Sequence, residues 1–179
     1  MKKLSIITVC LNEAKTIERT LKSVVDQSFT DYQYIVIDGG STDGTLDIIN
    51  NYHDRIDILI SEPDTGIFNA MNKGIKAAEG EYIFFLNAGD FFADNGAIGL
   101  LFSKSPSADL VYCDMLVKMN NGFVLRKKTP KKITKAFMFG DSIPHQATFT
   151  KREALVKYGG YNENYKIGGD YDLSPKFPE

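Results

Sequence analysis

Seven aspartates follow short apolar runs or lie in turns, and these carboxylates are the best candidates for chemistry in the sequence. They are Asp38, Asp43, Asp64, Asp90, Asp114, Asp170 and Asp172. Such groups can hold a hard cation, accept hydrogen bonds from sugar hydroxyls or a base N–H, or take a proton from an attacking hydroxyl. Together these are the needs of group transfer from a nucleotide-linked donor, because a cation stabilises the diphosphate leaving group. For Ser41, Thr42 and Asp43, turn formation and helix capping are an equally good interpretation.

Three common signatures of nucleotide binding or acyl transfer are missing. The segment 10–13, which follows the first apolar run, contains no glycine, so the GxGxxG dinucleotide fingerprint is absent from its expected place. No GxxxxGK[ST] phosphate loop occurs either. The segment 39–43 departs from the GxSxG nucleophile motif at Asp43, and the sequence has only 2 histidines to serve as base. The sequence therefore disfavours a serine hydrolase and both of these nucleotide-binding motifs.

Hydrophobic periodicity indicates the elements that must position the carboxylates. Strands predicted at 4–9, 34–37, 56–60 and 82–86 alternate with helices predicted at 13–27, 46–52 and 67–78. Alternation with continuous apolar strands predicts a parallel sheet with helices on both faces. Ligands in such sheets bind beyond the carboxyl ends of the strands. The site is therefore expected in the loops 10–13, 38–45, 62–66 and 87–90.

The pattern changes after residue 94. We expect a short helix at 97–102, then a strand at 110–117 that turns at 120–122 into 123–125, which predicts an antiparallel hairpin. A further strand is predicted at 146–150 and a helix at 152–158. The segment 126–135 carries six basic residues in ten.

The composition is that of one soluble domain. The chain has 179 residues, 43% of them hydrophobic, and a formal net charge of -2. This length suits one α/β unit, and the near-neutral charge gives no overall attraction for nucleic acid. No apolar run approaches the roughly 20 residues that cross a bilayer, and no signal-peptide cleavage site follows the basic start. We expect a cytoplasmic protein in which Cys10 and Cys113 are buried thiols.

Three ordered segments resemble a known family. They are LSIITVCLNE at 4–13, YIVIDGGSTDGT at 34–45 and NKGIKAAEGEYI at 72–83. Their order and spacing are similar to those of the inverting family 2 glycosyltransferases, and among these to bacterial enzymes that build capsular, exopolysaccharide or lipopolysaccharide chains. The resemblance extends over about residues 3–173. It implies the GT-A fold, a Rossmann-like α/β fold of nucleotide-diphospho-sugar transferases, with a mixed, mainly parallel sheet and helices on both faces.

The resemblance also implies how the chain is divided. Residues 1–179 are expected to form a single glycosyltransferase domain, with 1–95 as the nucleotide-binding half and 96–179 as the acceptor-side half. Relatives continue beyond the region of Asp170 with a helix and further elements, whereas two prolines in the last five residues here oppose a helix. We therefore expect the acceptor side to be truncated at the C-terminus.

Carried over to this sequence, the resemblance assigns twelve residues to the nucleotide-sugar site. They are Thr8, Val9, Cys10, Asn12, Glu13, Asp38, Asp64, Asn72, Asn87, Ala88, Gly89 and His145. Asp38 is expected to face the base or ribose, and Gly39 stands where many members have an acid that reads the uracil edge. Asp64 is expected either to supply a compensating acceptor or to lie in an exposed loop. His145 is expected either to lie near the sugar and diphosphate or to be structural.

The resemblance further implies a metal ligand and a catalytic base. Family members usually have Asp-x-Asp-Asp after the fourth strand, where this chain has Asn-Ala-Gly-Asp at 87–90. Asp90 is therefore the expected ligand of Mg²⁺ or Mn²⁺, since diphosphate oxygens can complete the coordination. Asp170, within IGGDYD at 167–172, matches the base that deprotonates the acceptor hydroxyl. Asp172 is the neighbouring candidate, and a simple turn is the alternative interpretation.

The predicted function is transfer of a hexosyl or N-acetylhexosaminyl group, with inversion, from a nucleotide-diphosphate donor to a glycan or lipid-linked acceptor in cell-surface polysaccharide synthesis. A UDP-sugar is the favoured donor, and a GDP-sugar remains open. The alternative, favoured by the glycines at 39 and 89, is a nucleotide-sugar-binding module or fragment without transferase activity. The basic segment 126–135 is expected to contact phosphates of the acceptor or the inner face of the plasma membrane, or else to be a solvated loop.

Overall fold

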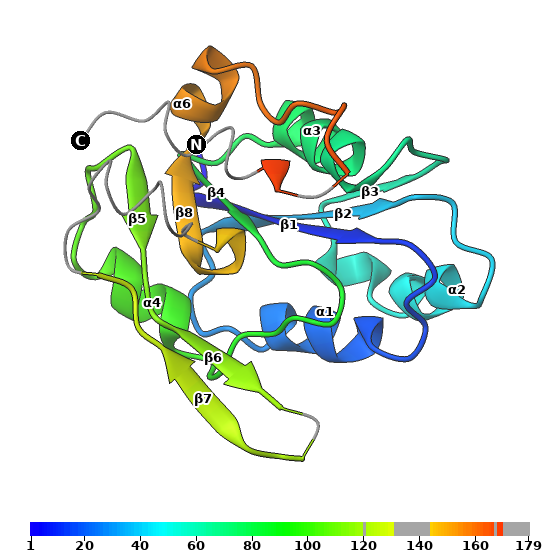
Figure 1. Ribbon diagram of the computed structural model, residues 1–179, viewed down its shortest axis with the longest axis horizontal. Coiled ribbons are helices and arrows are strands. Elements are labelled where there is room, and N and C mark those ends of the chain that lie inside the picture. The colour runs from blue at the N-terminus through cyan, green and yellow to red at the C-terminus, as the bar shows by residue number, and fades with distance from the viewer. Residues whose placement is uncertain (120, 131–143, 167, 170–179) are drawn as a thin grey trace.

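The computed structural model describes residues 1–119, 121–130, 144–166 and 168–169. Asp170, Asp172 and residues 131–135 of the basic segment lie outside the described residues. Figure 1 shows a central sheet with helices on either side of it.

Strands and helices alternate through residue 85, as the periodicity predicts: β1 (Leu4–Cys10), α1 (Ile17–Val25), β2 (Tyr32–Asp38), α2 (Thr45–Asn50), β3 (Ile58–Ser61), α3 (Ile67–Ala77) and β4 (Tyr82–Phe85). The remaining elements are α4 (Ala97–Phe102), β5 (Leu110–Tyr112), β6 (Met115–Lys118), β7 (Val124–Lys127), β8 (Thr148–Lys151) and α6 (Arg152–Lys157). Short 3₁₀ helices lie at His53–Arg55 and His145–Ala147.

Six strands form the main sheet, in the order β3-β2-β1-β4-β8-β5. β1 to β4 run parallel, in a register that pairs Cys10 with Asp38 at the carboxyl ends of β1 and β2. β8 runs antiparallel between β4 and β5. The sheet is mixed and mainly parallel, which confirms the predicted fold class. The carboxyl ends of its four parallel strands meet at one edge, where ligands bind in such sheets.

Two hydrophobic clusters cover the two faces of the sheet. Along β1, Leu4 and Ile6 belong to the cluster built with α1, α2 and α4, whereas Ile7 and Val9 belong to the cluster built with α3 and α6. Figure 1 shows these two sets of helices on opposite sides of the sheet. Because both faces are covered, every residue of β1 is buried, and the strand reads as a continuous apolar run.

The single strand predicted at 110–117 is wrong, because the chain leaves the main sheet in the middle of it. β5 pairs with β8, whereas β6 pairs with β7 in a separate two-stranded sheet. At the break, the Asp114 carboxylate accepts hydrogen bonds from Arg126 and from the Thr129 N–H, and the Thr129 hydroxyl donates to the Cys113 carbonyl. Cys113 is exposed here, which corrects the expectation of a buried thiol, whereas Cys10 is buried as expected.

Within the described ranges, no helix has both the length and the apolar character that crossing a membrane requires.

A close backbone contact fixes the connection between α3 and β4. The Gly80 N–H donates to the Ser5 hydroxyl, which in turn donates to Gln33 Oε1. A Cβ placed on Gly80 would lie far inside contact distance of the backbone atoms Ser5 N and Leu4 C. Backbone atoms of a buried central strand cannot move aside cheaply, so this position requires glycine.

We therefore expect Gly80→Ala to lower the free energy of unfolding by about 1–3 kcal/mol through overpacking. The matched control is Gly99→Ala in α4, where the nearest atom to an added Cβ is Ser28 Oγ at 4.0 Å. The control should leave stability unchanged or raise it by up to about 1 kcal/mol, since alanine favours a helix. Urea unfolding followed by circular dichroism measures both, and equal midpoints for the two variants would contradict the assignment.

Candidate functional site

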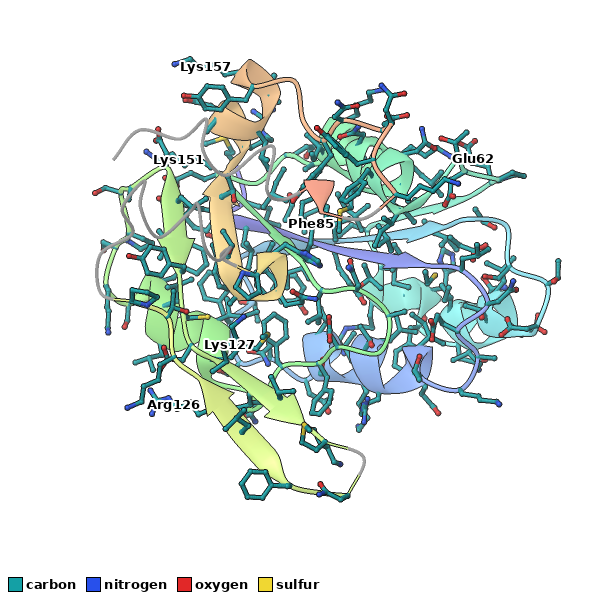
Figure 2. The ribbon with its side chains drawn as sticks, viewed as in Figure 1. Glu62, Phe85, Arg126, Lys127, Lys151 and Lys157 are labelled. Carbon is teal, nitrogen blue, oxygen red and sulfur yellow. The ribbon has the colours of Figure 1, made fainter. Side chains whose placement is uncertain are left out.

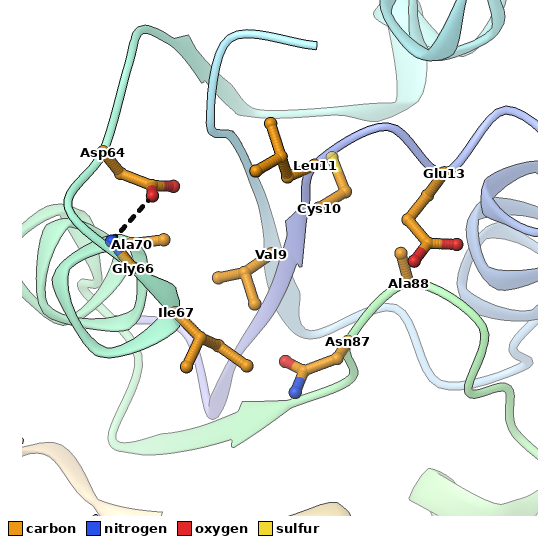
Figure 3. Close-up of a pocket in the computed structure, with 10 residues that line it drawn as sticks. All are labelled: Val9, Cys10, Leu11, Glu13, Asp64, Gly66, Ile67, Ala70, Asn87 and Ala88. Carbon is orange, nitrogen blue, oxygen red and sulfur yellow. Dashed lines mark hydrogen bonds between the residues drawn. The ribbon is translucent and has the colours of Figure 1, made fainter. Parts of the chain in front are cut away.

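A cavity of about 280 Å³ opens at the carboxyl ends of β1 and β4, beside the start of α3 (Figure 3). Its walls come from the loops after β1, β3 and β4 and from the first turn of α3. The residues that line it are Val9, Cys10, Leu11, Glu13, Asp64, Gly66, Ile67, Ala70, Asn87 and Ala88. The cavity therefore lies where the strand order and the sequence both place a ligand site.

Asp38, at the end of β2, lies beneath this edge and is fully buried. Its carboxylate accepts hydrogen bonds from the hydroxyls of Ser41 (2.5 Å) and Ser61 (2.7 Å) and from the backbone N–H groups of Gly40 and Ser41. Burial alone would raise the pKa of Asp38, but these hydrogen bonds hold it below its ordinary value. Asp38 is not part of the cavity lining, and its oxygens serve the protein itself.

The loops after β1 and β2 are joined by reciprocal hydrogen bonds. The Asn12 N–H donates to the Ser41 hydroxyl at 2.8 Å, and the Thr42 N–H donates to Asn12 Oδ1 at 2.9 Å. The Glu13 N–H donates to the Thr45 hydroxyl at 2.7 Å. The hydroxyls of Ser41 and Thr45 are therefore occupied in joining the two loops, as the turn interpretation expects. The capping interpretation is wrong for the N-cap of α2, which is Gly44 and makes no side-chain cap hydrogen bond.

Asp64 reaches into the space above Gly39. Its Oδ1 accepts a hydrogen bond from the Gly66 N–H at 2.9 Å, which aims the carboxylate across the loop (Figure 3). A Cβ on Gly39 would lie 2.5 Å from Asp64 Oδ2 and 3.4 Å from Leu11 Cδ1. The carboxylate of Asp64 thus fills the volume that a side chain at position 39 would enter.

Asn87 forms the wall below the end of β4. Its Nδ2 lies 3.0 Å from His145 Nε2, at the start of the 3₁₀ helix that precedes β8. Its Oδ1 is buried and has no hydrogen-bond partner among the described residues. A buried polar atom without a partner is costly, so it marks a place where a ligand group can donate a hydrogen bond or a cation can be held.

Asp90 follows in a loop that α1 holds in place. The Thr20 hydroxyl donates to the Asp90 carbonyl at 2.7 Å, and Arg19 Nη2 donates to the Gly89 carbonyl at 2.9 Å. Burial raises the pKa of the Asp90 carboxyl, while His145, a hydrogen bond from Gln146, and Arg19 act in the opposite direction. Asp90 and Gly89 are not among the residues that line the cavity.

Asn72 lies away from the cavity, on α3. Its Nδ2 donates to the Tyr161 carbonyl and to Glu163 Oε1, each at 2.8 Å, and its Oδ1 accepts from the Tyr161 N–H at 2.9 Å. The amide is therefore used to fasten the segment after α6 to α3. Thr8 also has a structural role, because it is buried in the sheet and its hydroxyl is hydrogen-bonded to the Tyr34 hydroxyl.

The structure thus brings together some of the predicted residues and leaves others apart. The lining includes Val9, Cys10, Glu13, Asp64, Asn87 and Ala88, and does not include Thr8, Asn12, Asp38, Asn72, Gly89, Asp90 and His145. Asp170 lies outside the described residues, but Gly169 is described: a Cβ there would lie 2.7 Å from the Phe68 ring, beside the start of α3.

Four lining residues were not assigned from the sequence, although Leu11 and Gly66 lie in the predicted loops 10–13 and 62–66. These four are Leu11, Gly66, Ile67 and Ala70, and Leu11 and Ile67 are 51% and 40% exposed. The available signals were a leucine directly after a strand and an isoleucine at the first turn of α3. Ile67 falls on the apolar helical face of α3, so the periodicity assigned it to the core.

Comparison with protein families matches residues 5–158 to glycosyl transferase family 2. The chain is 33% identical over 182 residues to the PGL/p-HBAD biosynthesis glycosyltransferase Rv2957 of Mycobacterium tuberculosis, and the match covers 95% of this chain and 67% of that protein. The chain therefore spans about two thirds of the length of this relative.

Solved structures share the fold. Residues 1–349 of S. aureus TarS in complex with UDP-GlcNAc superpose with a TM-score of 0.77 at 21% identity, over 98% of this chain and 53% of that one. The mannosyltransferase PcManGT from Pyrobaculum calidifontis, in complex with GDP-Man and Mn²⁺, superposes with a TM-score of 0.73 at 20% identity, over 98% and 51%. The family match over most of the chain and the shared fold lead to one conclusion: the chain belongs to the family 2 glycosyltransferases, with the GT-A fold.

Proposed function

We propose that the chain transfers a hexosyl or N-acetylhexosaminyl group from a nucleotide-diphosphate sugar to a glycan or lipid-linked acceptor, with inversion at the anomeric carbon, in cell-surface polysaccharide synthesis. The observation that carries the proposal is the cavity at the strand ends, which has the Asp64 carboxylate on one wall and the unpartnered Asn87 Oδ1 on another. Apolar side chains between them suit the flat face of a base, and the polar groups suit its edge and the donor.

Asp64 is the proposed reader of the base. A carboxylate accepts hydrogen bonds from the ring N–H of uracil or guanine, and Asp64 extends into the space beside Gly39 where other family members carry their acid. A UDP-sugar is the favoured donor and a GDP-sugar is the second choice. The support comes from TarS, crystallised with UDP-GlcNAc, and from PcManGT, crystallised with GDP-Man.

Asp90 and Asn87 are the proposed protein ligands on the diphosphate side. Among the described residues, no group of three or more acidic, histidine or cysteine side chains could hold a metal by itself. One carboxylate and one unpartnered amide oxygen suit Mg²⁺ or Mn²⁺ only when diphosphate oxygens supply the remaining ligands. These residues fit a cation that arrives with the donor, and its chemistry is to neutralise the departing diphosphate. PcManGT was crystallised with Mn²⁺ and GDP-Man together.

Asp170 is the proposed base. An inverting transfer is a direct displacement, so the acceptor hydroxyl must lose its proton on the face opposite the leaving diphosphate. Gly169, which precedes Asp170 in the sequence, lies beside Phe68 of α3, and Phe68 follows the cavity residue Ile67.

We further propose that residues 1–95 form the donor half and residues 96–179 the acceptor side of one domain, acting in the cytoplasm. The basic segment 126–135, of which 126–130 is described, would contact the inner face of the plasma membrane.

A second candidate is a nucleotide-sugar-binding module without transferase activity. It is favoured by the glycines at positions 39 and 89, where the family carries acids. Donor binding without turnover would support this candidate against the first.

Asp64→Asn should weaken binding of a UDP-sugar roughly tenfold or more, because a charged acceptor facing the base is replaced by an amide. Isothermal calorimetry measures the affinity, and Asp54→Asn, at an exposed position in the 3₁₀ helix His53–Arg55 and outside the cavity lining, is the matched control.

The double variant Gly39→Asp with Asp64→Ala sharpens this test. It moves the acid to the position that other family members use and vacates the space that a side chain at 39 needs. Affinity close to that of the unmodified chain is expected. Should Asp64→Asn bind as well as the Asp54→Asn control, Asp64 does not read the base.

Asp90→Asn should remove most of the effect of Mn²⁺ on donor binding. In the unmodified chain, we expect Mn²⁺ to raise affinity roughly tenfold or more, because Asp90 would hold a cation that neutralises the charge of the diphosphate. Asp94→Asn is the control, because its Oδ1 can still accept the hydrogen bond from the Gly96 N–H at 2.8 Å. An equal response to Mn²⁺ in both variants would rule out Asp90 as ligand.

Asp170→Asn should lower sugar transfer roughly 100-fold or more while leaving donor affinity unchanged, because a general base contributes to the chemical step and not to donor binding. Transfer is followed with a radiolabelled sugar, and Asp172→Asn is the matched control. Retained transfer in Asp170→Asn together with its loss in Asp172→Asn would move the base to Asp172.

A further inference from the structure

β6 and β7 form a two-stranded ribbon that is separate from the main sheet. Figure 1 shows the ribbon extending away from the six-stranded sheet, beyond α4. None of its residues belongs to either hydrophobic cluster of the described chain. The two strands therefore hold together chiefly through their own ladder, from Met115–Lys127 to Lys118–Val124.

The end of the ribbon is unusually apolar for a surface. Five of the twelve large apolar side chains that the described structure exposes fall in this short stretch, namely Leu116, Met119, Phe123, Val124 and Leu125. Phe123 is the most exposed of them, at 64%. Exposed apolar side chains clustered in one place mark a site of interaction with a membrane or another protein.

The register puts these apolar groups on both faces of the ribbon. Val117 pairs with Leu125, and Met119 follows on the same face opposite Phe123, whose carbonyl accepts from the Met119 N–H at 2.8 Å. Leu116 and Val124 lie on the other face. A protein partner docks against one face of a ribbon and leaves the other in water. A lipid environment surrounds both faces, so this distribution favours lipid.

The ribbon is also basic. Between residues 114 and 128 there are four cations, Lys118, Arg126, Lys127 and Lys128, against one carboxylate, Asp114. Asp114 and Arg126 pair at 2.6 Å at the base of the ribbon. The formal charge of this segment is therefore +3, on a chain whose net charge is -2. Basic side chains directly behind an apolar tip match the phosphates that lie above the hydrocarbon of a bilayer.

We propose that the tip of the β6–β7 ribbon inserts into the headgroup region of an anionic lipid bilayer. Phe123, Met119 and Leu125 enter the apolar boundary, while Lys118, Lys127 and Lys128 meet lipid phosphates. This deepens the membrane contact proposed above, since it names an inserting element in place of a purely electrostatic one. It does not depend on which sugar donor the cavity binds.

The absence of tryptophan from the chain gives a direct probe. Phe123→Trp introduces a single tryptophan at the ribbon tip, and Val156→Trp on α6, at a position 57% exposed, is the matched control. With vesicles of phosphatidylcholine and phosphatidylglycerol, we expect the emission of Phe123→Trp to shift to shorter wavelength and to become protected from iodide. The control should show neither change, and vesicles of phosphatidylcholine alone should have little effect on either variant.

Vesicle sedimentation tests the energetics. Phe123→Ser should weaken binding to the anionic vesicles roughly tenfold or more, as expected for loss of one inserted aromatic side chain. Lys127→Glu with Lys128→Glu should weaken it by a similar factor at low salt. Val156→Ser and Lys157→Glu are the controls, and Figure 2 shows Lys157 at the top of the view, well away from Lys127.

Three results would overturn the proposal. If the lysine variants lose binding while Phe123→Ser retains it, the contact is electrostatic and nothing inserts. If no variant and no unmodified chain binds vesicles, there is no lipid contact. If Phe123→Ser instead abolishes self-association in size-exclusion chromatography, a second copy covers the ribbon. Calorimetry with a UDP-sugar on Phe123→Ser is the separate readout: failed donor binding in all forms would defeat the proposed function and leave vesicle insertion standing.

Discussion

The donor edge of the sheet depends on one buried negative charge. Asp38 ends β2 with no solvent exposure, and a charge in that position is tolerated only while hydrogen-bond donors surround it. Ser41, Ser61 and the Gly40 N–H supply them, which fixes the loop after β2 against the end of β3. The loop after β1 is then held through Asn12 and Ser41. Two of the loops that line the cavity, those after β1 and β3, are thus connected to this carboxylate through Ser41 and Ser61.

The carboxylate above Gly39 comes from Asp64, in a different loop from the one that carries the family motif. A carboxylate placed by the loop after β3 occupies the space that a side chain at position 39 would take, and Asp64 would have to shift if both side chains were present. In the proposed donor complex, the base meets a carboxylate that the loop after β3 supplies in place of the loop after β2. At the end of β4, Asn87 Oδ1 has no hydrogen-bond partner in the described part of the chain, and Gly89, two residues further on, stands where the family motif has an acid.

The parts of the fold that could be predicted are those that the local hydrophobic pattern of the sequence specifies. β1 to β4 and α1 to α3 follow from apolar periodicity, because each element buries a face that its own sequence marks. The break between β5 and β6 could not be predicted, since Asp114 is bonded to Arg126 and Thr129, twelve and fifteen residues away. The hydrogen bond from Asn72 to the Tyr161 carbonyl joins residues 89 positions apart, and the motif around Asn72 does not predict it. The exposed Ile67 looks like a core residue until the cavity beside it is seen.

The placement of β8 has a consequence for the order of assembly. β5 precedes β8 in the chain but lies outside it in the sheet, so β5 has no strand to pair with until residues 148–151 have been added. Until then, the open side of β4 presents unpaired backbone groups that can pair with another chain. During synthesis, the first four strands can form a sheet early, and the second half must wait for one late strand. A nascent chain paused before β8 would carry a completed donor edge and an uncapped, aggregation-prone flank.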